Sequence, residues 1–148
     1  MDNKVTDALY QAAGLTFEEL GFLFPIRENS SNAVKNFSNS VTINFHGDCN
    51  GKIILNVSPE LLPIIAENIL GDDEMPSEEM QIDALGEVAN VICGNALPMI
   101  FGKTSVIRLD PPEHSGFSQM NGSTNEIRLG FDEGHADILL YLNKGKLV

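Results

Sequence analysis

Apolar residues recur along the chain with two periods, which predict where its helices and strands lie. The helical period, with an apolar side chain every three or four positions, runs through residues 3–24 and again from residue 78 to about 101. A shorter helix is expected between them, because Ser58-Pro59 is typical of a helix start and Gly71 of a helix end. The pattern therefore predicts helix in three stretches of the chain.

The first helical stretch contains signals for a break. Gly14 lies in its interior, where glycine is unfavourable, and Thr16 and Glu19 have the spacing of a capping box. These residues favour a second helix start near Thr16, and Pro25 is expected to end the stretch. The polar residues 26–40 that follow are expected to form a loop or a weak edge strand.

The strand period appears next. Residues 41–46 alternate between apolar and polar, and residues 52–57 form a more continuous apolar run. Asn50-Gly51 between them favours a tight hairpin. The alternation places three apolar side chains on one face of the first strand: Val41, Ile43 and Phe45.

The C-terminal third predicts a meander. Ser77 is expected to cap the long second helix, and Asp110–Gly116 and Asn121–Thr124 read as turns. Four strand-like segments surround these turns: 104–109, 117–120, 125–131 and 136–143. The element order predicts an α+β fold, an α/β sandwich in which helices pack on a mostly antiparallel sheet of about six strands. The length suits a single domain, residues 1–148.

Charge and cysteine content exclude several classes of protein. The formal net charge of -12 disfavours nucleic acid and anionic membranes as partners, although solubility alone also accounts for such acidity. Cys49 and Cys93 are too few for a disulfide framework or a zinc cluster. Residues 1–10 lack the apolar region of a signal peptide, so a cytoplasmic protein is expected.

The helix around DALGEVANVICGN, residues 83–95, has two distinct faces. At roughly 100° per residue, one stripe is apolar and is expected to pack on the sheet. Its members, with the residues that flank them, are Leu85, Ala89, Ile92 and Ala96, flanked by Ile82, Cys93 and Ile100. The opposite stripe carries two carboxylates, an amide and a glycine: Asp83, Glu87, Asn90 and Gly94.

This polar stripe has two interpretations. A plain solvated helix face commonly carries glutamate and asparagine, and Gly86 would then only allow tight packing. A stable surface helix, however, favours alanine or lysine over glycine and asparagine. Gly94 lies one turn beyond Asn90, where it would let another backbone approach closely.

The residue types on the stripe narrow the chemistry. An amide is neither base nor nucleophile, but it orients water, which suits hydrolysis of a phosphoryl group. A carboxylate one turn away is suited to pair with a lysine of another protein. No Ser-His-Asp or Cys-His arrangement and no phosphate-binding loop is present in the sequence. The three histidines are isolated from one another: His46, His114 and His135.

These residues resemble the motif of the chemotaxis phosphatase family that includes CheC, CheX and the phosphatase domain of FliY. The family pattern is Asp or Ser, three residues, Glu, two residues, Asn, and a proline just over twenty residues on. Here the pattern reads Asp83, Glu87 and Asn90, followed by the pair Pro111-Pro112, either of which can match. Gly94-Asn95 also looks like the family's helix, and the element order extends the likeness over nearly the whole chain.

The resemblance implies a phosphatase that docks on a phosphorylated response regulator of the CheY type. It implies that Asn90 orients the attacking water and that Glu87 pairs with the regulator's lysine. Asp83 would support the helix face or the docking surface, and the proline pair would shape the edge of the site. The magnesium ion belongs to the regulator, so no metal or cofactor of the chain's own is expected.

CheC-type relatives often carry two copies of the motif. Here DALYQAAG at residues 7–14 aligns loosely with DALGEVAN, but Gln11 replaces the glutamate and Gly14 replaces the asparagine. A single complete site is more like CheX, and this resemblance implies a homodimer, with sheet edges as one route of association.

Two alternatives remain open at this stage. The first is a non-catalytic module of the same fold, which binds a response regulator or another signalling protein without hydrolysis. The second is a metal-dependent hydrolase that uses the acidic loop Gly71–Pro76, although its consecutive carboxylates lack the spacing of a calcium loop.

Overall fold

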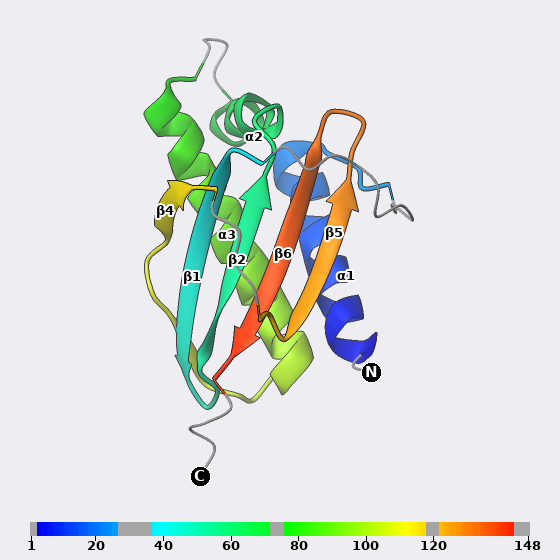
Figure 1. The fold of residues 1–148 in the computed structure, drawn as a ribbon, viewed down its shortest axis with the longest axis vertical. Coiled ribbons are helices and arrows are strands. Elements are labelled where there is room, and N and C mark those ends of the chain that lie inside the picture. The colour runs from blue at the N-terminus through cyan, green and yellow to red at the C-terminus, as the bar shows by residue number, and fades with distance from the viewer. Residues whose placement is uncertain (1–2, 27–36, 72–75, 118–121, 144–148) are drawn as a thin grey trace.

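A six-stranded antiparallel sheet forms one layer of the protein in the computed structural model (Figure 1). The structure describes residues 3–26, 37–71, 76–117 and 122–143. The strands are β1 (Asn39–Gly47), β2 (Gly51–Val57), β3 (Ile107–Leu109), β4 (Glu113–Gly116), β5 (Asn125–Gly130) and β6 (His135–Leu142). Their order is β3-β1-β2-β6-β5, and β4 also pairs with β1. The expected antiparallel sheet of about six strands is confirmed.

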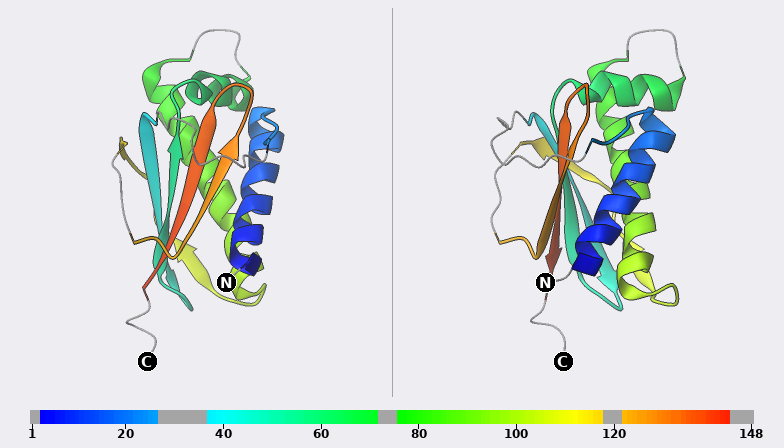
Figure 2. Two further views of the ribbon diagram at one scale, coloured as in Figure 1. Left: turned by 45° about the vertical axis from the view of Figure 1, so that its right-hand side comes forward. Right: turned by 90° about the vertical axis from the view of Figure 1, so that its right-hand side faces the viewer.

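Three helices form the second layer and all cover the same face of the sheet (Figure 2). They are α1 (Asn3–Gly21), α2 (Leu61–Leu70) and α3 (Glu78–Phe101). The apolar side chains of this layer and of the facing sheet form one core. Helix α3 is long and apolar enough to cross a membrane, but half of its most apolar stretch is buried inside the protein, as in the core helix of a globular domain.

The first two strands form the expected hairpin, but Asn50-Gly51 is not its tight turn, because Gly51 is already the first paired residue of β2. Phe45 pairs with Gly51 next to the turn, and Val41, Ile43 and Phe45 are all buried toward the helices. A side chain at Gly51 would meet the backbone carbonyl of Tyr141, so only glycine fits this close approach of β6.

Two predicted helix starts are wrong, because each side chain has found another partner. α1 is continuous, and the Thr16 hydroxyl donates to the Ala12 carbonyl at 2.7 Å instead of capping a new helix. Ser58 does not cap α2, whose N-cap is Glu60; its hydroxyl accepts the backbone N–H of His135 at 3.0 Å. Gly71 ends α2 in the left-handed conformation, as expected.

The segment Asp110–Gly116 was expected as a turn, but part of it is β4. Thr42 of β1 pairs with Glu113, and the Asp110 N–H donates to the Asn44 carbonyl at 2.9 Å. Pro111 and Pro112 cannot donate to β1, so they divide one edge strand into β3 and β4.

Two other expected segments lie largely outside the described residues. They are the loop or edge strand at 26–40, of which 27–36 are not described, and the strand at 117–120, of which only Phe117 is described. Ile26 forms an isolated bridge with Gly130 of β5.

Candidate functional site on helix α3

Helix α3 begins where the sequence predicts and its first turn is well capped. The Ser77 hydroxyl accepts the backbone N–H of Met80 at 3.2 Å. Glu78 and Glu79 lie in the first turn, where the helix dipole favours negative charge. The cap sets where the helix starts, and with it which residues face outward.

The polar stripe predicted on α3 faces away from the core. Asp83, Glu87 and Gly94 are exposed, and Asn90 is half-buried. The opposite stripe is buried as expected: Leu85, Ala89, Ile92, Cys93 and Ala96. The structure therefore brings the four predicted residues of the stripe onto one outward side of a single helix.

Helix α3 is also buried on a side that the sequence pattern did not mark. Ala84 and Val88 are buried because α1 and α2 pack against α3 along with the sheet. Only a narrow outward stripe therefore remains for binding.

The structure explains why residue 86 is a glycine. A Cβ there would lie 3.1 Å from the imidazole of His114 and 3.3 Å from Cγ of Pro112, closer than a neighbour tolerates without shifting. Pro112 and His114 thus lie directly on α3 at Gly86, one turn before Asn90, whereas no such contact is seen for the exposed Pro111. Sequence reasoning missed His114, since no local pattern links residue 114 to residue 86.

The residues from Ile107 to His114, which we call the strand wall, are held in place at several points. Oδ1 of Asp110 lies 2.8 Å from Nε2 of His46. Both side chains are exposed, so this pair contributes little stability by itself. Just before the wall, the Val106 N–H donates to the Asp48 carboxylate at 2.7 Å. Together with the contact at Gly86, these bonds fix the wall alongside the outward stripe.

A cavity of about 120 Å³, which we call the α3–β3 notch, lies between the helix and the wall. Its lining includes Cys93, Gly94, Leu97 and Pro98 of α3 and Ile107 and Leu109 of β3. No charged side chain lines it. Burial raises the pKa of the Cys93 thiol to about 12, so the thiol stays protonated at neutral pH and is no nucleophile.

The chemistry of this site is that of an amide and carboxylates. Among the described residues, no three histidine, cysteine or carboxylate side chains are grouped to hold a metal ion. The carboxylates of the acidic loop, Asp72 to Glu74, lie outside the described residues. Glu87 and Asn90 can form hydrogen bonds and ion pairs with a docked molecule and can position water.

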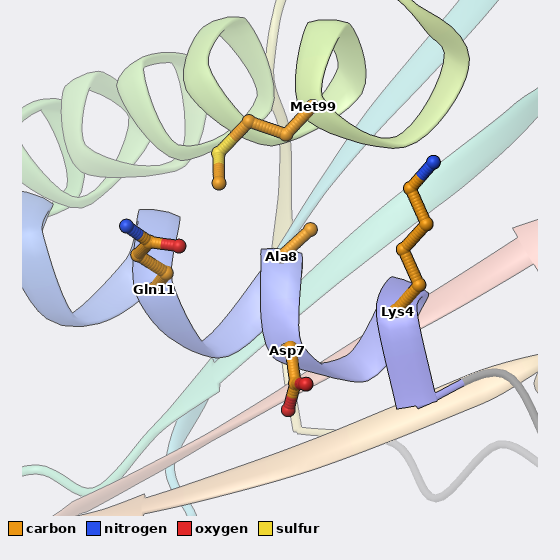
Figure 3. Close-up of a pocket in the computed structure, with 5 residues that line it drawn as sticks. All are labelled: Lys4, Asp7, Ala8, Gln11 and Met99. Atoms are coloured by element: carbon orange, nitrogen blue, oxygen red, sulfur yellow. The ribbon is translucent and has the colours of Figure 1, made fainter.

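The region of α1 that aligns with the motif forms a separate groove of about 490 Å³ against the C-terminal part of α3 (Figure 3). Gln11 points toward α3, and Asp7 points away from Met99 (Figure 3). Gly14, at the position that corresponds to Asn90, is buried. The groove therefore has neither the glutamate nor the asparagine of the stripe on α3.

A family model matches more than half of the chain. The family model described as chemotaxis phosphatase CheX matches residues 39–124, which include α3 and the strand wall. No curated protein matches the sequence significantly.

Solved structures show the same fold at low sequence identity. A CheX protein from Desulfovibrio desulfuricans has a TM-score of 0.77 at 19% identity, covering 94% of this chain and 99% of that one. CheX from Vibrio vulnificus has a TM-score of 0.77 at 16% identity, covering 95% and 97%. CheX in a CheX–CheY–BeF3–Mg complex from Borrelia burgdorferi has a TM-score of 0.70 at 19% identity, covering 95% and 98%. Because the family model spans more than half of the sequence, this chain belongs to the CheX family of chemotaxis phosphatases.

Proposed function

We propose that this protein hydrolyses the aspartyl phosphate of a CheY-type response regulator. Asn90 orients the attacking water, and Glu87 pairs with the lysine of the regulator's active site. The observation that carries the proposal is the outward placement of Glu87 and Asn90, one turn apart on a well-capped helix. Within the described part of the chain, neither side chain has a hydrogen-bond or ion-pair partner, so both are free to meet a docked protein.

Positioning supplies most of the catalysis in this chemistry. Phosphoryl transfer needs an in-line nucleophile and compensation of charge, and it needs little covalent participation by the protein. In this proposal the regulator contributes the phosphoaspartate, the lysine and Mg²⁺, while this chain contributes the water-orienting amide. The complex of CheX with CheY, BeF3 and Mg from Borrelia burgdorferi supports a regulator of this type as the partner.

The other predicted residues shape the docking surface. Asp83 adds negative charge one turn before Glu87, which favours a partner with an exposed lysine. Gly94 leaves this part of the helix without a side chain. The space above it is open, since an added Cβ would have nothing within 4 Å, so a partner backbone can approach closely. Pro112, which lies on Gly86, borders the stripe, and the exposed Pro111 precedes it. We also place the protein in the cytoplasm, the compartment expected from its sequence.

The decisive experiment compares wild type with Asn90→Ala for phosphate release from a phosphorylated CheY-type regulator. Loss of the amide should cost about 2–4 kcal/mol of transition-state stabilisation, or about 30-fold to 900-fold in rate. Asn95→Ala is the matched control, since Asn95 is an exposed asparagine of the same helix that points about 140° away.

Each outcome of this experiment has one meaning. Release at a wild-type rate by Asn90→Ala would contradict the mechanism. Tight binding of the phosphorylated regulator by wild type, without faster release, would instead identify a non-catalytic module of the same fold.

We further propose that the protein is a homodimer that associates through the free edge of β5. Among the described residues, β5 ends the sheet: it pairs with β6 on one side, and on the other side Ile26 forms a single bridge with Gly130. Large exposed apolar side chains occur at the end of α1 and just after it: Leu15, Phe22, Phe24 and Ile26. Phe22 is 64% exposed and has a φ of 52°, a strained conformation for a bulky residue, which suggests that its side chain serves an interface.

The oligomeric state tests this proposal directly. Light scattering should report a dimer for wild type and a monomer for Phe24→Glu. A monomeric wild type, or a Phe24→Glu variant that still dimerises fully, would contradict it.

A further inference from the structure

We infer that the α3–β3 notch receives an apolar side chain of the phosphorylated regulator and forms a second contact beside the catalytic pair. The inference rests on the proposed function and adds to it a specificity pocket outside the motif. It concerns residues of β3 that no part of the motif includes.

The position of the notch follows from the geometry of α3. Gly94 lines the notch and lies four residues after Asn90, about 6 Å further along the helix axis on the same side. A regulator that places its phosphoaspartate at Asn90 therefore covers the mouth of the notch. Nothing in the described part of the chain fills the space above Gly94.

The lining of the notch selects the chemistry of the occupant. No charged side chain lines it, and Leu109 on its wall is 37% exposed, so part of this apolar side chain is open to a partner. The adjoining stripe is acidic at Asp83 and Glu87. The structure therefore fits a partner that presents a lysine to Glu87 and, about two helical turns or roughly 10 Å further along α3, an apolar side chain to the notch.

The wall of the notch is preorganised for this contact. The bonds at Asp110 and Val106 and the contact of Pro112 with Gly86 fix the wall against the sheet and the helix. A wall that is already ordered loses little conformational freedom on binding, so the apolar contact contributes more of its energy to affinity.

The test compares two exposed apolar residues that lie three positions apart. Leu109 lines the notch, whereas Val106 is 64% exposed and does not line it. The probe is the CheY-type regulator that wild type dephosphorylates fastest, loaded with beryllofluoride and Mg²⁺. We expect Leu109→Gln to raise the Kd about fivefold to tenfold and Val106→Gln to leave it within about twofold.

Two controls keep the result interpretable. Leu109→Met preserves an apolar side chain and should bind like wild type, and thermal melting of all variants shows whether Leu109→Gln remains folded. The defect of Leu109→Gln should appear as a raised KM for the phosphorylated regulator, because the notch is inferred to contribute to binding while Glu87 and Asn90 are intact.

The outcomes separate this inference from the proposed function. An unchanged Kd for Leu109→Gln, or equal losses for both glutamine variants, would overturn the notch while phosphate release by wild type still supports a phosphatase. If wild type neither binds nor dephosphorylates any CheY-type regulator, the notch and the proposed function both fail.

Discussion

Helices α1 and α3 contain similar sequences but have different surroundings. Both contain Asp-Ala-Leu, and Asp7, Gln11 and Gly14 correspond in spacing to the three motif residues of α3. Asn90 is half-buried at the edge of an outward stripe, with Pro112 and His114 one turn away on Gly86. Gly14 is buried, and a Cβ there would lie 3.4 Å from Cγ of Pro25.

Equal spacing along two helices therefore does not give equal surroundings. On α3 the neighbouring chain is an edge strand that runs beside the stripe and leaves it open. On α1 the chain turns back after Gly21, so that Pro25 lies on the position that corresponds to the asparagine. The CheX family model, which matches residues 39–124, includes α3 and does not include α1.

The largest difference in phosphate release should appear when a lysine is introduced at equivalent positions of the two helices. Glu87→Lys should abolish phosphatase activity, because the new ammonium group would face the regulator's lysine. Gln11→Lys should leave phosphate release unchanged, since no site is proposed on α1. Steady-state release with one regulator measures both. Equal activity of the two variants would break the comparison.

A smaller effect is expected from one buried glycine on each helix, Gly86 on α3 and Gly14 on α1. Gly86→Ala forces His114 and Pro112 to move by a few tenths of an ångström, and we expect phosphate release to fall about threefold to tenfold. Gly14→Ala should leave release unchanged and raise the free energy of unfolding by up to about 1 kcal/mol, because alanine favours helix and its contact with Pro25 is ordinary.

The double variant Gly86→Ala/His114→Ala sharpens this test. Removal of the imidazole makes room for the new methyl group, so release should recover most of the loss, while His114→Ala alone should stay near wild type. A Gly86→Ala defect that His114→Ala does not relieve would show that the contact is not its cause.

The smallest expected effect comes from grafting the motif onto α1. Gln11→Glu/Gly14→Asn, made in the Asn90→Ala variant, should restore no measurable phosphate release. The new amide would pack against Pro25 instead of reaching a partner, and no strand wall adjoins it. Recovery of release would mean that the motif residues suffice without their surroundings.

Much of this architecture follows from local sequence patterns, because its determinants are close in sequence. Ser77 caps α3 through the residue three positions later, and the alternation of apolar and polar residues marks the two strands of the hairpin. The outward position of Glu87 and Asn90 follows from helical periodicity. The family and the fold are confirmed, and the catalytic roles of these two residues stay predictions.

The predictions that failed depend on partners distant in sequence. Ser58 has the sequence context of a helix cap, but its hydroxyl accepts the backbone N–H of His135, which is 77 residues away. Residues 113–116 have the composition of a turn, but they form a strand because they pair with β1. The contact between His114 and α3 could not be predicted from local sequence, because it depends on the absence of a side chain at Gly86.

The proline pair also affects how this protein behaves in a crowded solution. An exposed sheet edge is a template on which strands of other molecules can add, which is a common start of aggregation. Pro111 and Pro112 interrupt the edge formed by β3 and β4 and offer no N–H to an incoming strand. The proposed catalytic side of the molecule is thus protected from strand addition.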